Sequence, residues 1–347
     1  MQILLSNMAC ISMKSSMNWG WMATGKKQMN QNNALPDIAA FLKSQDTLTL
    51  FCHVRPDGDT LGSAFGLMDL LESLGKRVKV LCADPVSPRY RFLSGGRADL
   101  LGTPEGALVC IDIAAPDMAG AYAAFAKQAD LVIDHHATNP YFGKWNYIDA
   151  AAGATGEILV DLAEELGPLS PRAAAAFYTA IATDTGCFKY GNTTRATHLK
   201  AARLMETEFD VAALNRWLFQ TKSQAEFEIN RLAMETLRFY AGGRIVTMLI
   251  SREMLLQTAA GADELESISS LPIQIEGAVV AATFKEAEPG QYKVSLRTNG
   301  LLDGGKICAL FGGGGHRMAA GCSMRGAYET LEACMVKTLR QELEKVQ

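Results

Sequence analysis

One six-residue stretch constrains the fold of this chain more than any other, Leu131-Val132-Ile133-Asp134-His135-His136. Three apolar residues, two of them β-branched, lead directly into an acid and two histidines. This order is typical of a buried strand in an α/β sheet whose carboxyl end, where open α/β sheets bind ligands, carries polar side chains. A strand followed by an ordinary polar turn would look the same. The other strands decide between these two interpretations.

Two further apolar runs end in acids in the same way. Residues 47–52 predict a buried strand that leads into His53-Val54-Arg55-Pro56-Asp57-Gly58-Asp59 and then into a helix that extends to Leu74. Residues 107–111 predict another strand, which is followed at once by Asp112. Asp57 and Asp59 can converge on one ion or flank two, although an Asp-rich turn with a helix N-cap would give the same residues.

A fourth acid follows an alanine-rich segment. Residues 173–181 predict a helix that leads to a turn at Asp184, and we group Asp184 with the acids at strand ends. Residues 77–82 supply one more strand. Strands separated by helical segments predict βαβ units and a mainly parallel sheet, so several of these acids should meet at one sheet edge.

The second half of the chain has a different pattern. Residues 209–239 have helical apolar spacing without Gly or Pro, and strand-like runs and a final amphipathic helix (328–346) follow. The predicted fold class is α/β, with a parallel-sheet domain joined by a helical connector to a smaller α/β domain and the active site in the cleft. The predicted bounds are 1–34 for a poorly ordered extension, 35–208 for the first domain, 209–241 for the connector and 242–347 for the second domain.

Composition limits the partners and the compartment. The 347-residue chain has a net charge of −4, so it lacks the global basic field that holds long nucleic acid, although a local basic groove is still compatible with this charge. Its eight cysteines are scattered singly, which favours a reducing compartment, and we expect a cytoplasmic protein. No apolar run approaches the roughly 20 residues that a membrane span needs.

The polar residues that follow these elements form a metal-ligand set. It has too many carboxylates and no thiolates, which argues against a structural zinc site, and it suits two divalent ions that share a carboxylate. Because imidazole takes part, manganese is favoured, with magnesium and cobalt as alternatives. The candidate ligands are His53, Asp57, Asp59, Asp112, His135 and Asp184, with Asp134 and His136 beside them.

These motifs resemble the DHH phosphoesterase superfamily. The resemblance rests on His53-Val54-Arg55-Pro56-Asp57-Gly58-Asp59, Ile111-Asp112, Asp134-His135-His136 and Thr183-Asp184-Thr185-Gly186, and it runs from about Leu35 to the C-terminus. Within the superfamily the chain is most similar to the group of oligoribonucleases (nanoRNases) and pAp phosphatases. The segments that carry this second similarity are residues 191–198 and Gly312-Gly313-Gly314-Gly315-His316.

The resemblance implies a role for each candidate. One ion would be held by His53, Asp57 and Asp112, and the other by Asp59, Asp112, His135 and Asp184, so that Asp112 bridges them. His136 would be the catalytic residue that faces the substrate as an acid or a phosphate contact. Asp134 would orient a ligand histidine, a common arrangement behind metal sites.

The second domain resembles the DHH-associated domain, and its glycine run is the expected substrate contact. A flexible linker is the alternative, but linkers rarely lie between Phe311 and Ala319-Ala320-Gly321 inside a domain. Consecutive glycine amides can form an anion-binding nest, and an arginine can grip a terminal phosphate with two hydrogen bonds. The predicted substrate-binding residues are Arg297, Gly313, Gly314, Gly315 and His316.

The metal-ligand set and the resemblance together imply a two-metal-dependent phosphoesterase that hydrolyses short oligoribonucleotides and 3′-phosphoadenosine 5′-phosphate. The alternatives are a linear or cyclic dinucleotide phosphodiesterase, a RecJ-like single-strand exonuclease and, in a different class, a catalytically inert nucleotide-binding regulator. A RecJ-like enzyme would need additional basic or OB-type modules, and the glycine-rich loop argues against an inorganic pyrophosphatase. We expect no long nucleic acid and no membrane as partner, and a homodimer is left open.

Overall fold

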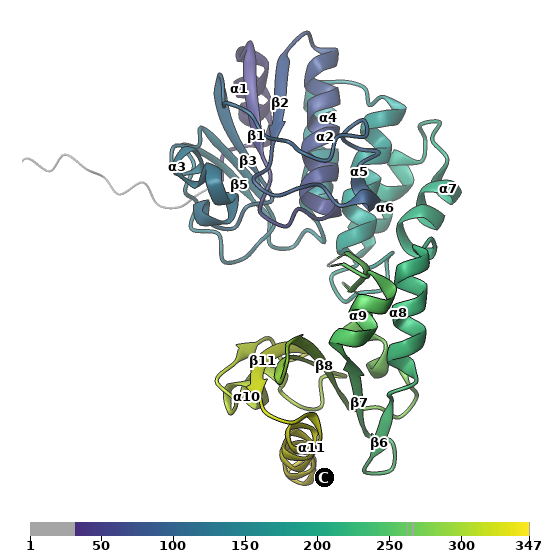
Figure 1. Cartoon of the computed structure of the whole chain (residues 1–347). Helices are drawn as coiled ribbons and strands as arrows, with labels where there is room; N and C mark the ends of the chain where they lie inside the picture. The colour runs from purple at the N-terminus through teal and green to yellow at the C-terminus, as the bar shows by residue number, and fades with distance from the viewer. Residues whose placement is uncertain (1–31, 262, 266, 347) are drawn as a thin grey trace, which may run out of the picture. The chain divides into compact units, whose positions relative to one another are not determined.

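The computed structural model describes residues 32–261, 263–265 and 267–346 (Figure 1). The chain forms two compact units. The first takes in the described residues up to Val86 together with Leu93–Phe209, and the second takes in Ser87–Phe92 and the chain from Asp210 onward. Most of the predicted extension, 1–34, lies outside the described residues, and the domain bounds proposed from the sequence stay predictions.

A five-stranded parallel sheet forms the centre of the first unit, as predicted. The strand order is β2-β1-β3-β4-β5, and all neighbours run parallel. The carboxyl ends of these strands therefore lie along one edge of the sheet. The strands are β1 (Thr47–Phe51), β2 (Arg77–Leu81), β3 (Ala107–Ile111), β4 (Leu131–Asp134) and β5 (Trp145–Ile148).

Strand β5 was not predicted from the sequence, because it is a short edge strand with an alternating burial pattern. Its free edge is covered by the chain just before the first helix. The side-chain oxygens of Asn32 and Asn33 accept hydrogen bonds from the amides of Ile148 and Asn146, at 2.7 and 2.9 Å. This covering protects an edge that would otherwise be open for pairing with another strand.

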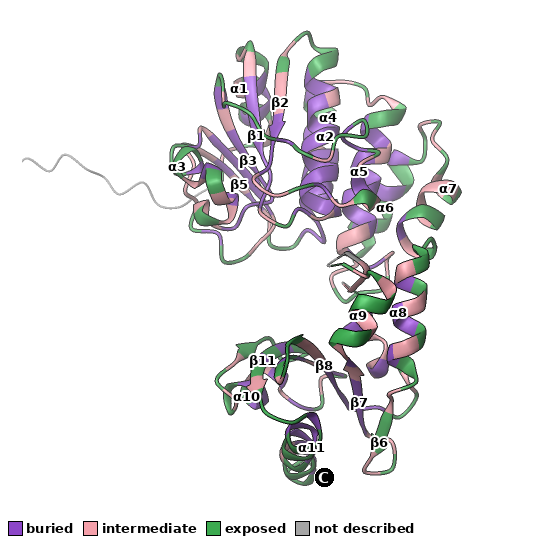
Figure 2. Cartoon of the chain, in the orientation of Figure 1, coloured by how far each residue is buried: buried purple, intermediate pink, exposed green. Residues whose placement is uncertain are grey.

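Helices cover this sheet, and two of them cross closely. Figure 2 shows α2 buried along most of its length. A Cβ placed on Gly62 of α2 would lie 2.4 Å from the carbonyl oxygen of Ala176 in α5, so a glycine is needed for the contact. The helices of this unit are α1 (Leu35–Ser44), α2 (Gly58–Ser73), α3 (Ala123–Ala126), α4 (Thr155–Leu166), α5 (Pro171–Asp184) and α6 (Arg195–Leu204), with a 3₁₀ segment η2 (Pro116–Tyr122).

The grouping of Asp184 with the strand-end acids was wrong. Asp184 is the last residue of helix α5, because no Gly or Pro interrupts the chain after Pro171 until Gly186, whose φ of 57° follows the helix end. Asp59 also lies inside a helix, since α2 begins at Gly58 with Asp57 as its N-cap. The metal-ligand set therefore comes from strand ends and helix ends together.

The second unit contains a six-stranded mixed sheet in the order β10-β11-β9-β8-β7-β6. Strands β7 and β8 are parallel, and the other neighbours are antiparallel. Its strands are β6 (Arg238–Tyr240), β7 (Ile245–Ile250), β8 (Val280–Glu288), β9 (Gln291–Thr298), β10 (Gly314–Gly315) and β11 (Ala319–Arg325).

Helix α11 packs on one face of this sheet, where Phe284, Val294 and Leu296 meet Met335 and Leu339 in a common core. The helices are α7 (Val211–Asn215), α8 (Gln224–Met234), α9 (Arg252–Thr258), α10 (Gly304–Ala309) and α11 (Tyr328–Glu344), with the short segments η1 (Pro88–Tyr90), η3 (Arg216–Gln220), η4 (Asp263–Leu265), η5 (Ile268–Ser270) and η6 (Pro272–Gln274). Among the described residues, no helix is long and apolar enough to cross a membrane.

The helical prediction for residues 209–239 was wrong at its end. Arg238–Tyr240 form strand β6, which pairs antiparallel with β7. The connecting turn contains Ala241, Gly242 and Gly243, all with positive φ. The glycines make this reversal accessible, and the aromatic residues before it suit a strand.

Candidate metal centre

His53 and Asp57 come from the loop that joins β1 to α2. The Nδ1 atom of His53 lies 2.8 Å from the carbonyl oxygen of Val54, so this nitrogen can donate there and leave Nε2 free as a ligand. Nε2 lies 3.5 Å from Oδ1 of Asp57 and 3.6 Å from Oδ2 of Asp112. The same Asp57 oxygen accepts the amides of Asp59 and Thr60 as the N-cap of α2. Asp57 is thus both a cap and a candidate ligand.

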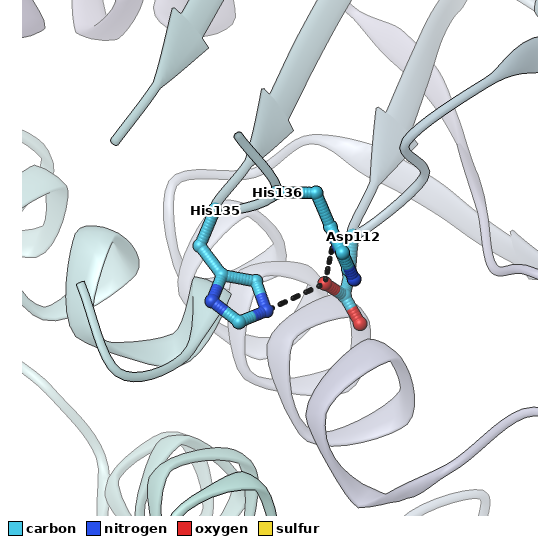
Figure 3. A group of neighbouring side chains, drawn as sticks. All are labelled: Asp112, His135 and His136. Carbon is cyan, nitrogen blue, oxygen red and sulfur yellow. Dashed lines mark ion pairs between the residues drawn. The ribbon is translucent and has the colours of Figure 1, made fainter. Parts of the chain in front are cut away.

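Asp112 follows β3 and lies at the centre of the cluster. It is 2% exposed and adopts a φ of 58°, an unusual conformation for a residue other than glycine that is often found at functional sites. While Oδ2 faces His53, Oδ1 lies 3.6 Å from Nε2 of His135 and 3.6 Å from Nδ1 of His136. Figure 3 shows both histidine rings directed at this one oxygen. The two oxygens of Asp112 therefore face different groups, as a bridging carboxylate requires.

His135 completes a second group of ligands. Its Nδ1 lies 3.2 Å from the carbonyl oxygen of Ala152, and its Nε2 is surrounded by three carboxylates. Nε2 lies 3.7 Å from Asp59, 3.6 Å from Asp112 and 3.7 Å from Asp184. Ligands about 2.1 Å from a shared ion lie roughly 3–3.5 Å from one another. These side chains would therefore need to move only slightly closer together to hold one ion.

The electrostatics of the cluster favour bound cations. Burial and the charge of Asp112 raise the pKa of Asp59 well above its usual value, and burial raises the pKa of Asp184 to about 6. Burial lowers the pKa of His53, but hydrogen bonds to Asp112 and Asp57 outweigh it and raise this pKa to about 11. Without metal, bound protons therefore neutralise part of the negative charge of these carboxylates. Divalent cations would replace those protons, because carboxylate and imidazole ligands bind metal in their deprotonated forms.

Three groups of side chains have donor atoms close enough together to hold an ion. In each group the donor atoms lie within 4.8 Å of one another. Two of the groups correspond to the two metal positions implied by the resemblance. Among the described residues, the groups are His53, Asp57 and Asp112; Asp59, His135 and Asp184; and Asp112, His135 and His136.

His136 is held differently from His135. Its Nδ1 lies 2.7 Å from Oδ1 of Asp134. Asp134 is fully buried, and its other oxygen, Oδ2, accepts a 2.7 Å hydrogen bond from Asn139. The hydrogen bond to Asp134 raises the pKa of His136 to about 9. Because Nδ1, the nitrogen that lies 3.6 Å from Asp112, is engaged by Asp134, His136 is a poorer candidate ligand than His135. Asp134 therefore orients His136, assigned above to the substrate, and not the ring of the predicted ligand His135.

Sequence reasoning missed the first turn of α4. The amides of Thr155 and Gly156 donate to the two oxygens of Asp59, at 2.7 and 3.0 Å. The hydroxyl of Thr155 donates to Oδ1 of Asp112 at 2.9 Å. Thr155 is fully buried, so it touches both carboxylates away from solvent. The only signal in the sequence is a run of small residues before an acidic helix, which is too common to single out.

The predicted substrate residues lie in the second unit, in and beside β9 and β10. Arg297 is half-buried in β9 and donates from Nη1 to the carbonyl of Leu296. Burial lowers the pKa of Arg297. Gly314 and Gly315 form β10, and His316 follows at its exposed end. Whether these residues contact substrate stays a prediction.

Two of the four glycine amides are not free for the predicted anion nest. The amides of Gly312 and Gly313 donate to the carbonyls of Ala309 and Cys308, and that of His316 donates to Ala319. A Cβ on Gly313 would lie 2.2 Å from the carbonyl oxygen of Gly321. The glycines thus allow close packing against β11, and Gly314–Gly315 form one strand of a hairpin with β11.

Comparison with known proteins agrees with this architecture. Residues 47–181 match the N-terminal domain of the DHH family, and residues 245–345 match the DHHA1 domain. The bifunctional oligoribonuclease and PAP phosphatase NrnA of Thermus thermophilus is 33% identical over 321 residues, which cover 89% of this chain and 94% of that protein. The NrnA protein of Bacillus subtilis is 28% identical over 284 residues, covering 80% and 90%.

The fold is also found in a solved structure. An exopolyphosphatase-related protein from Bacteroides fragilis superimposes with a TM-score of 0.78 at 22% identity, covering 90% of this chain and 95% of that one. At this identity the likeness concerns the fold alone. The two domain matches and the length of the match to the Thermus thermophilus relative show that the chain belongs to the DHH family, and in this chain the DHH domain is followed by a DHHA1 domain.

Proposed function

We propose that this protein is a metal-dependent phosphoesterase that hydrolyses short oligoribonucleotides and 3′-phosphoadenosine 5′-phosphate. The observation that carries the proposal is the pair of ligand groups on either side of Asp112, each made of carboxylates and an imidazole. The names of the NrnA relatives, which match most of the chain, support the choice of substrates. The free cysteines of the described chain, most of them buried, support a cytoplasmic location.

Two divalent ions fit the candidate centre. His53, Asp57 and Asp112 would hold one, and Asp59, Asp112, His135 and Asp184 would hold the other. Carboxylate and imidazole donors without sulfur favour manganese, with magnesium and cobalt as alternatives. When bound, two such ions stabilise the charge that develops on phosphoryl oxygens and lower the pKa of a water molecule.

His136 is proposed as the catalytic residue that acts on the substrate. Its ring is fixed through Nδ1 by the buried carboxylate of Asp134, and about 40% of its side chain is exposed. With a pKa raised to about 9, the imidazole is protonated at neutral pH. From Nε2 it can donate a hydrogen bond to a phosphate oxygen, or a proton to the leaving oxygen.

Arg297, Gly313, Gly314, Gly315 and His316 are proposed to bind the terminal phosphate or the adjacent nucleotide. Only one N–H donor of Arg297 is engaged, at Leu296, among the described residues. The planar guanidinium therefore keeps donors for a bidentate contact with a phosphate. In the hairpin, the backbone of Gly314 and Gly315 is exposed, and His316 follows directly at the end of β10.

A substrate panel tests the proposal. Purified protein with Mn²⁺ would be given ribonucleotide dimers and pentamers, 3′-phosphoadenosine 5′-phosphate, cyclic dinucleotides, pyrophosphate and long single-stranded DNA, and kcat/KM would be compared. We expect the highest values for the RNA dimers and pentamers and the bisphosphate. A preference for cyclic dinucleotides, pyrophosphate or long DNA would refute the proposed substrate class, and no hydrolysis at all would favour an inert regulator.

A further inference from the structure

One face of the second unit's sheet carries cations that have no ion-pair partner in the described part of the chain. Along β9, Tyr292, Val294 and Leu296 belong to the core under α11, so the alternate residues Lys293 and Arg297 lie on the opposite face. Lys293 is exposed and Arg297 is half-buried. The same alternation in β11 leaves its odd-numbered residues, from Ala319 to Arg325, on this face.

Two lysines lie directly opposite each other on this face. The strand register pairs Lys285 of β8 with Lys293 of β9. Like charges in this position repel, so such a pair destabilises the sheet unless an anion is shared between them. Among the described residues neither lysine has an ion-pair partner, whereas Glu288 of β8 pairs with Arg252 and Glu286 accepts a hydrogen bond from the backbone amide of Arg252.

The floor between the cations is made of small residues. The register places Ala319 beside Arg297, Gly321 beside Ser295 and Ser323 beside Lys293. A ligand can therefore approach β9 and β11 closely at Gly321 and Ser323, which are exposed. Thr283 of β8 lies beside Ser295 and is 2% exposed, so the open part of this face lies over β9 and β11.

The spacing of the cations indicates a ligand with more than one phosphate. Lys293 and Arg297 are four residues apart in one strand, which separates them by about 14 Å. One phosphate cannot contact both. The chain as a whole is acidic, with a net charge of −4, and so does not attract a polyanion through its overall charge. A local cluster of cations lets it attract one.

We infer that this face binds the sugar-phosphate backbone of a short single-stranded oligoribonucleotide, with Lys285 and Lys293 contacting a phosphate beyond the nucleotide held at Arg297. The inference rests on the proposed function and extends it, since it assigns two residues that distinguish oligonucleotides from dinucleotides and from a nucleoside bisphosphate. Its consequence is that affinity rises with length beyond two nucleotides.

Direct binding without catalysis tests the inference. Metal-free protein in EDTA would be titrated against 5′-phosphorylated RNA dimers and pentamers at several salt concentrations. Lys285→Gln and Lys293→Gln would be compared with Lys337→Gln, because Lys337 is an exposed lysine on α11, which packs on the opposite face of the same sheet. Each test substitution should weaken pentamer binding roughly 2–5-fold, the strength of an exposed charge pair.

The salt dependence gives a second readout. For each lost phosphate contact, the slope of log affinity against log salt should become shallower by about 0.7, and only for the pentamer. Equal losses for dimer and pentamer, or losses no larger than those of Lys337→Gln, would overturn the inference. If the pentamer binds as expected but is not hydrolysed with Mn²⁺, the proposed function fails and the binding face stands.

Discussion

At the scale of single residues, the candidate metal site depends as much on the side chains that orient the candidate ligands as on the candidate ligands themselves. The sequence could identify His53, Asp57, Asp112 and His135, because each follows an apolar run that predicts a buried strand. It could not identify Thr155, whose importance comes from the fold, which brings the start of α4 against Asp112. No local pattern distinguishes such a threonine from any other at a helix start.

Thr155→Val should weaken metal binding without unfolding the protein. The substitution keeps the shape of the side chain but removes the hydroxyl that orients Asp112, and loss of such a partner typically costs 10–100-fold in metal affinity. Isothermal titration with Mn²⁺ measures the effect, and Thr155→Ser should restore it. Thr179→Val is the matched control, because Thr179 is equally buried but donates to a backbone carbonyl in α5. Equal effects of the two valine substitutions would show that Thr155 is only structural.

Asp134→Asn should reduce kcat and shift its pH dependence while leaving both metal ions in place. The carboxylate stabilises the imidazolium of His136, so its removal lowers the pKa of His136 from about 9. If protonated His136 is required, the alkaline limb of the kcat–pH profile should move to lower pH. The His136→Ala variant should lose most of kcat and bind both ions. Loss of one metal equivalent in His136→Ala would make His136 a ligand instead.

At the scale of elements, the pairing of α2 with α5 sets the distance between Asp59 and Asp184. The strands β1 to β4 and the long helices α2, α5 and α11 could be predicted from apolar periodicity. The position of Asp184 inside a helix could not be predicted, since an acid before Thr-Gly fits a helix end and a strand end equally well. The strand β6 and the hairpin of β10 were also missed, because three-residue and two-residue strands are defined by their partners and not by their own sequence.

Gly62→Ala should destabilise the protein and disturb the ligand group of Asp59. The added Cβ would lie 2.4 Å from the carbonyl oxygen of Ala176, a backbone atom, so the two helices must move apart. Overpacking of this kind costs typically 1–3 kcal/mol in the free energy of unfolding. Chemical denaturation and Mn²⁺ titration measure the two effects. Gly191→Ala is the control, because a Cβ there meets nothing within 4 Å, and similar values for both variants would contradict this account of the helix contact.

At the scale of the whole molecule, the chain combines an acidic centre in one unit with unpaired cations in the other. The first unit concentrates buried carboxylates around Asp112, and we propose that the second offers Arg297, Lys285 and Lys293 to phosphates. Composition alone shows the average of the two, a net charge of −4. Long nucleic acid was disfavoured on that average, and the proposed cation cluster would let the protein bind short polyanions.

We propose that Asp112 bridges two metal positions, and the Asp112→Ala variant is the sharpest test of that bridge. Mn²⁺ content and kcat/KM on an RNA dinucleotide would be measured for the variant and the wild type, with circular dichroism as a check on folding. Removing one buried carboxylate from a cluster of like charges should leave the fold intact. We expect reduced metal content and no measurable turnover. Near-wild-type turnover with unchanged metal content would contradict the two-metal assignment.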